Sequence, residues 1–91
     1  MRATCVTVEP VYHEVNGEIK VQTPLYPLVL EHLNSGNLVK EWTEQHDEYG
    51  HWSCSLYTTP VGLIVRQDWV PNYGYAWRET RIYRLTVGGD Q

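Results

Sequence analysis

The side chains best suited to binding lie between residues 66 and 84. Four aromatic rings fall within nine residues around a Pro-Asn-Tyr-Gly turn, namely Trp69, Tyr73, Tyr75 and Trp77. Exposed rings on a tight turn can anchor a protein partner, or form a stacking wall for a planar or sugar ligand. The structural alternative is that Trp69 and Trp77 pair across the hairpin and fill the core. We expect Trp69, Tyr75 and Trp77 to be core residues, whereas Tyr73 at the turn has little to bury against.

Successive side chains of a strand point to opposite faces, and three arginines alternate with the apolar residues, so they would lie on the face opposite to them. Arg66, Arg78 and Arg84 would form a row on the outer face of a sheet, with Asp68 and Thr80 among them. Such a row can hold carboxylate or phosphate through paired hydrogen bonds, so an anionic small molecule or an acidic protein surface is a plausible target. The alternative is a solvated face with cross-strand ion pairs, such as Arg66 or Arg78 with Asp68.

In a regular strand, Glu79 and Arg81 would lie on the same face as Trp77 and Tyr83. The other residues expected on that face are apolar. Charges on a face toward the core require an explanation, because an unpaired buried charge is costly. Either a bulge at Glu79-Thr80 resets the alternation, or both charged side chains project into a semi-exposed groove and pair there. We include Glu79 and Arg81 in the candidate binding site.

Motifs of catalysis, metal binding and cofactor binding are not recognisable. A base with an orienting acid could be assembled from His51, Asp68 or Glu79, but nothing in the sequence places these residues together. Residues 46–54 contain two His, one Asp, one Glu and one Cys, yet His51 and Cys54 would face opposite ways on a strand. We therefore expect no catalytic residues, no metal and no cofactor.

Length and charge restrict the possible partners. A chain of 91 residues has room for one domain, near the size at which burial just outweighs chain entropy, so we expect a homodimer. The net charge is −4, and the acidic residues are concentrated in the first 50 positions. This charge disfavours direct binding to nucleic acid. The carboxylates of residues 41–48 could instead imitate phosphates toward a basic protein.

Cysteine usage and hydropathy indicate a cytoplasmic protein. Cys5 and Cys54 are too few for a disulfide framework, and we expect both to be buried free thiols. We recognise no signal peptide and no apolar run long enough to cross a membrane. A membrane partner is therefore not expected.

The candidate side chains require a sheet that positions them. Residues 51–87 predict three consecutive strands, because β-branched and aromatic residues alternate there between turn signals. Residues 24–34 predict one short helix, with apolar residues at helical spacing and Gly36 placed to end it. Residues 37–50 fit a second helix or a strand about equally well.

The N-terminal part predicts a hairpin around Asn16-Gly17. An ideal two-residue turn would split the apolar residues between the two faces, so we expect a pairing shifted by one residue, with Glu14 beside Lys20. Pro10 cannot donate a ladder hydrogen bond and indicates an edge strand or a bulge.

Together these features predict an α+β fold in a small single domain of residues 1–91, with a frayed tail at 88–91. It comprises an N-terminal β-hairpin, one or two short helices and a C-terminal antiparallel β-meander packed on the helix. The leading hypothesis is a non-enzymatic, inhibitor-type protein that binds a protein partner through the aromatic hairpin and the arginine-bearing face. The second is an oligomer that sequesters an anionic or nucleotide-like ligand, and the third is an enzyme of unknown class.

Overall fold

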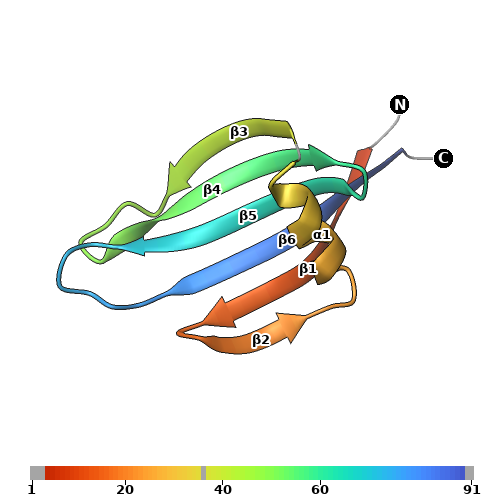
Figure 1. The fold of residues 1–91 in the computed structure, drawn as a ribbon. Coiled ribbons are helices and arrows are strands. Elements are labelled where there is room, and N and C mark those ends of the chain that lie inside the picture. Colours follow the sequence, from red (N-terminus) through yellow and green to blue (C-terminus); the bar gives the residue numbers. More distant parts are fainter. Residues whose placement is uncertain (1–3, 36, 90–91) are drawn as a thin grey trace.

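Six antiparallel strands form one sheet in the computed structural model, which describes residues 4–35 and 37–89 (Figure 1). The elements in chain order are β1 (Thr4–Val15), β2 (Glu18–Gln22), α1 (Tyr26–Leu33), β3 (Asn37–Glu44), β4 (Gly50–Thr59), β5 (Gly62–Pro71) and β6 (Glu79–Gly89). Across the sheet the order is β2-β1-β6-β5-β4-β3, so the first and last strands are neighbours. The expected α+β architecture, with a hairpin, one helix and a meander, is confirmed.

The N-terminal hairpin combines two registers. Asn16 and Gly17 both have positive φ, at 50° and 83°, and Val15 pairs with Glu18 as an ideal two-residue turn requires. The expectation of a shifted register beside the turn is therefore wrong. A bulge at Lys20 then adds one residue to β2, and beyond it His13 pairs with Val21 in the shifted register. The turn chemistry and the burial pattern are both satisfied, each over its own part of the strand.

Pro10 lies beside a bulge, as the sequence indicated. Pro10 pairs with Tyr83 and Tyr12 with Ile82, so Val11 is the extra residue on β1. The side chain of Val11 is fully buried in the core. The bulge thus accommodates a residue without an N–H and also turns one more apolar side chain inward.

Residues 37–44 form a strand, which settles the segment that sequence patterns left open. Leu38 pairs with Tyr57, and Lys40 with Leu56, so Val39 forms a further bulge. That bulge changes the alternation and places Leu38 and Trp42 on opposite faces, whereas an unbroken strand would have kept them together. Periodicity alone could not distinguish this strand from a helix, because the bulge removes the period-2 signal.

The helix α1 covers one face of the sheet (Figure 1). Val29 and Leu33 of α1 pack against a buried cluster that contains Val11, Ile64 and Ile82. We call this side the helix face and the opposite side the open face. Cross-strand pairing places the following side chains on the open face: His13, Trp52, Cys54, Gln67, Trp69, Glu79 and Arg81.

The last strand begins later and ends later than expected. Residues 72–78 form a loop, and β6 starts at Glu79 and continues to Gly89. The prediction of a frayed tail is wrong for residues 88 and 89, which pair with Cys5 and Thr4; residues 90–91 lie outside the described range. Glu79, Thr80 and Arg81 pair with Val15, Glu14 and His13 of β1 in unbroken register, so the alternative of a bulge at Glu79-Thr80 is wrong.

Candidate functional site

A groove lined mainly by aromatic rings lies at one end of the open face. Its volume is about 360 Å³, and its lining residues are Gln45, Tyr49, Trp52, Trp69, Tyr75, Trp77 and Glu79. We call it the aromatic groove. The strands β4, β5 and β6 supply its floor, and the loops of residues 45–49 and 72–78 supply its walls.

The rings of the groove are held by pairwise edge-to-face contacts. Trp52 and Trp69 are direct cross-strand partners, with ring centroids 5.3 Å apart and planes at 70°. Tyr49 and Tyr75, one from each wall, have centroids 5.1 Å apart and planes at 76°. Such pairs are favourable beyond the area they bury, so they stabilise the arrangement of the rings in the groove.

Hydrogen bonds tie the two walls together. The side chain of Asn72 donates from Nδ2 to the carbonyl oxygens of Asp47 (3.1 Å) and Glu48 (3.0 Å), and its backbone N–H donates to the Tyr49 carbonyl (2.9 Å). The Asp47 carboxylate accepts from the backbone N–H groups of Tyr49 (2.8 Å) and Gly50 (3.2 Å). These bonds fix Tyr49 in the wall, because they restrain the backbone on both sides of it.

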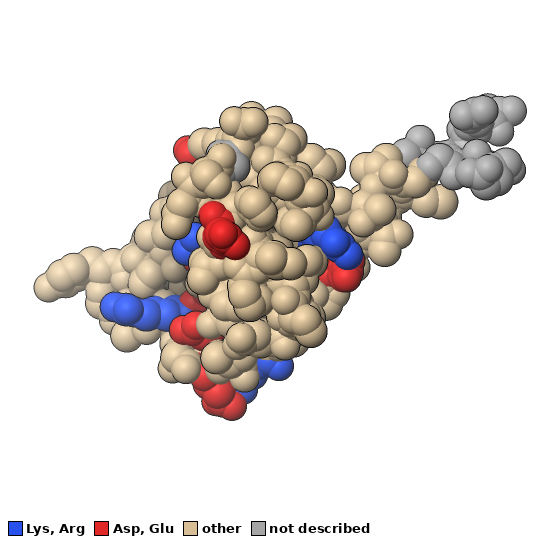
Figure 2. All heavy atoms as spheres, turned by 45° about the vertical axis from the view of Figure 1, so that its right-hand side comes forward, with Lys and Arg blue, Asp and Glu red and all other residues tan. Residues whose placement is uncertain are grey.

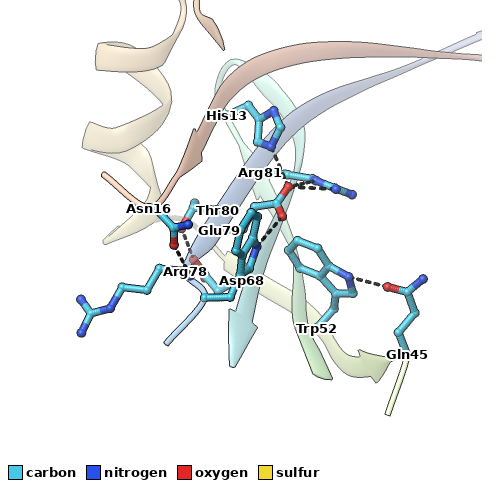
Figure 3. Close-up of polar contacts among 10 residues, drawn as sticks. His13, Asn16, Gln45, Trp52, Asp68, Arg78, Glu79, Thr80 and Arg81 are labelled. Carbon is cyan, nitrogen blue, oxygen red and sulfur yellow. Dashed lines mark hydrogen bonds and ion pairs between the residues drawn. The ribbon is translucent and has the colours of Figure 1, made fainter. Parts of the chain in front are cut away.

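Glu79 is the most highly connected side chain of the groove (Figure 3). Its Oε2 lies 2.7 Å from His13 Nε2 and accepts a 2.9 Å hydrogen bond from Arg81 Nε, while its Oε1 accepts from Trp77 Nε1 at 3.1 Å. Burial acts to raise the pKa of Glu79, but the bonds to His13, Trp77 and Arg81 outweigh it, and the pKa is lowered from its ordinary value. Glu79 is therefore a carboxylate near neutral pH.

Arg81 balances this charge and contacts one ring of the groove. Its guanidinium lies 2.9 Å from Glu79 Oε2 and 4.5 Å from the centroid of the Trp52 ring. A cation over an indole face is attracted by the ring quadrupole. The Glu79–Arg81 pair expected in a semi-exposed groove is thus observed, with 10% of the Glu79 side chain and 36% of the Arg81 side chain exposed.

The polar atoms of two indoles are already bonded within the protein. Trp52 Nε1 donates to Gln45 Oε1 at 2.6 Å, and Trp77 Nε1 donates to Glu79 Oε1 at 3.1 Å. Trp52 and Trp77 therefore present ring faces and edges to an incoming group rather than hydrogen-bond donors. An apolar or planar group meets these requirements best.

The structure places the four predicted aromatic residues in three environments. Tyr73, at the turn, is 104% exposed, as its position indicated. Tyr75 and Trp77 are 46% and 49% exposed, so the expectation that they are core residues is wrong. Trp69 is half-buried and packs on Trp52. Trp77 does not face Trp69 across a ladder, because residues 72–78 form a loop.

The prediction that Arg66, Arg78 and Arg84 form one row on the outer face of the sheet is wrong. Arg66 and Arg84 lie on the helix face, where Arg66 pairs with Asp68 (2.8 Å) and Arg84 with Glu9 (2.7 Å). Arg78 lies in the loop before β6, and its backbone N–H donates to Asn16 Oδ1 at 2.9 Å (Figure 3). Arg81, on the open face, is the predicted arginine that the fold brings to the aromatic groove.

Four residues of this region were not predicted as site residues. Gln45, Tyr49 and Trp52 line the groove, and His13 holds Glu79 from β1. The sequence feature that could have identified Tyr49 as a site residue is its position in the Asp-Glu-Tyr-Gly turn before β4. His13 gave no signal, because its contact with Glu79 joins residues 66 positions apart in the sequence.

The region of residues 46–54 does not assemble a metal centre. The rings of His46 and His51 stack in parallel, with centroids 4.6 Å apart. His51 and Cys54 lie on opposite faces of β4, as expected. Within residues 4–35 and 37–89, no group of three His, Cys, Asp or Glu side chains could hold a metal ion. Glu79 also lies on the face opposite to His51 and Asp68, so these three do not form one site.

The two cysteines are free, with Cys5 exposed and Cys54 buried. The expectation of a buried thiol is confirmed for Cys54 and wrong for Cys5. Burial raises the pKa of the Cys54 thiol, so it remains protonated and packs as a small apolar group.

Comparison of the chain with protein-family models, with curated proteins and with solved structures found no match. In the part of the chain that the structure describes, no helix has the length and apolar character needed to cross a membrane.

Proposed function

We propose that this chain is a non-enzymatic binding protein that holds a protein partner in the aromatic groove and inhibits it by occupying its surface. The observation that carries the proposal is a groove of five aromatic rings on the open face, three of them 46% to 51% exposed. Aromatic residues dominate the energetics of protein interfaces, and rings left exposed by the fold are available for that purpose.

The chemistry of the groove indicates the kind of side chain it would take. Its one carboxylate, Glu79, is paired with Arg81, and two of its indole N–H groups are bonded internally. The remaining surface suits an apolar or aromatic anchor residue.

The rim of the groove adds a preference for basic surroundings. Glu44, Asp47 and Glu48 lie in or beside the wall of residues 45–49, and the chain carries a net charge of −4. Carboxylates at the edge of an interface steer a partner of opposite charge and speed its association. The partner we propose therefore presents an apolar anchor on a positively charged protein surface.

A small planar ligand is the second candidate, and the size of the groove favours it. A volume of about 360 Å³ falls within the range of small-molecule sites. An anionic or nucleotide-like ligand would stack on the rings and use Arg81, but that guanidinium is already paired with Glu79. We therefore rank this candidate below a protein partner.

Affinity capture separates the two candidates. The protein is immobilised and exposed to a lysate of its natural host, in parallel with the variant Trp77→Ala, which removes one ring from the groove. The same protein, purified from that host, is examined by native mass spectrometry for a bound small molecule.

The proposal predicts a protein that wild type retains and Trp77→Ala does not. A small molecule bound by wild type, without a captured protein, would favour the second candidate. Equal retention of the same proteins by both forms would contradict a role for the groove.

A further inference from the structure

The first and last strands extend beyond the rest of the sheet as a two-stranded ribbon (Figure 1). We define the arm as residues 4–8 of β1 and 85–89 of β6, which pair with each other from Thr4↔Gly89 to Val8↔Leu85. In the described chain, β2 reaches β1 only from Tyr12 onward, and the pairing of β5 with β6 ends at Leu85. A ribbon of two strands is only marginally stable in water on its own.

The arm has one apolar and one polar face. Val6, Val8 and Val87 lie on the side that continues the open face, and they are 57%, 56% and 57% exposed. The other side carries Thr7, paired with Thr86, and the exposed Cys5. This alternation is typical of a ribbon with one face buried, yet no described part of the same chain covers the valines.

The arm is also free of charge. Its residues 4–8 and 85–89 contain no Asp, Glu, Lys or Arg, and the charges begin at its root, where Glu9 pairs with Arg84. In Figure 2 the described part of the projection is tan beyond one red and blue pair. Two copies of a chain with a net charge of −4 repel each other least where they carry no charge.

We propose that a second copy of this chain covers the arm, with the valine faces of the two arms packed against each other about a two-fold axis. Such an interface is self-complementary, because the same three valines contribute from both copies. The contact adjoins the central open face and leaves the aromatic groove, at the opposite end of the strands, accessible. The inference does not rest on the function proposed for that groove.

Sedimentation equilibrium of the full chain tests this inference. Wild type is expected at twice 10.6 kDa at micromolar concentration. Val6→Lys places a charge in the interface from each copy and should weaken the dimer about a hundredfold. The matched control is Thr7→Lys, on the other face of the same arm, which should leave the dimer within about twofold of wild type.

Val87→Lys provides a second variant on the valine face, and tryptophan fluorescence confirms that each variant remains folded. A wild-type monomer of 10.6 kDa would overturn the inference. So would equal weakening by Val6→Lys and Thr7→Lys, since that indicates pairing through the strand edge. A dimer weakened by Thr7→Lys alone would place the interface on the polar face and would also overturn it.

Discussion

A single carboxylate organises the polar part of the groove. Glu79 binds His13 from β1, Arg81 from its own strand and Trp77 from the preceding loop. Removing one partner of such a cluster leaves the others, whereas removing the carboxylate leaves three groups without their acceptor. Arg81 is therefore the residue at which binding and stability can be separated most cleanly.

Arg81→Ala should reduce binding more than it reduces stability. Glu79 retains its bonds to His13 and Trp77, and Arg81 is more than a third exposed, so we expect a stability loss of about 1 kcal/mol. The same change removes the cation from the face of Trp52 and alters the groove. Urea denaturation and partner titration on the same preparation measure both effects. A loss of about 3–5 kcal/mol would show instead that Arg81 is a buried core partner.

The lowered pKa of Glu79 predicts a dependence of stability on pH. A carboxylate with a lower pKa in the folded than in the unfolded state contributes its full stabilisation above the unfolded value, ordinarily 4.5. That contribution is lost as the pH falls through the lower folded-state pKa. Gln at this position cannot ionise, so the stability difference between wild type and Glu79→Gln should shrink on acidification.

Urea midpoints of wild type and Glu79→Gln, measured from about pH 7 down to about pH 3, test this dependence. The other carboxylates titrate in both proteins and cancel in the difference. A difference that stays constant over this range would mean that the ionisation of Glu79 does not contribute to stability.

At the scale of elements, the groove depends on how closely its two walls approach. Gly50 has a φ of +152°, and a Cβ at this position would overlap the Val70 carbonyl oxygen and lie 2.9 Å from Pro71 Cα. The start of β4 can therefore approach the end of β5 this closely only if residue 50 is glycine.

Gly50→Ala should push the walls apart, destabilise the fold by about 2–3 kcal/mol and weaken binding. Gly17→Ala is the matched control, because Gly17 also has a positive φ, of +83°, but open space around its Cβ position. Its cost should be only the backbone strain of about 1 kcal/mol. Thermal melts of the two variants compare them, and equal losses would show that the close approach at Gly50 is not limiting.

Local sequence signals predicted the elements better than their registers. Asn16-Gly17 fixed the first turn and Pro10 marked a bulge, because both effects act within a few residues. The extra residues at Lys20 and Val39 were not predictable, since each bulge depends on which strand lies alongside. Residues 37–44 remained ambiguous for the same reason.

At the scale of the whole molecule, the helix leaves one side of the sheet open. The helix face holds the buried cluster around Ile64 and Ile82, and the open face holds the groove and the arm. The alternation in the sequence showed which set of residues in each strand is mainly apolar. It could not show that α1 packs on the opposite face of the sheet. For this reason Tyr75 and Trp77 were expected in the core, although they are exposed in a groove.

The dependence of partner affinity on Trp77 tests the account most directly. Trp77 is 49% exposed and lines the groove, whereas Val70, at the same end of the sheet, is 40% exposed on the helix face. Calorimetric titration of the captured partner compares Trp77→Ala and Val70→Ala with wild type. We predict that Trp77→Ala raises Kd at least about thirtyfold, as for a hot-spot residue, with an unfolding midpoint close to that of wild type. A Kd unchanged by Trp77→Ala, or raised equally by Val70→Ala, would contradict the aromatic groove as the binding site.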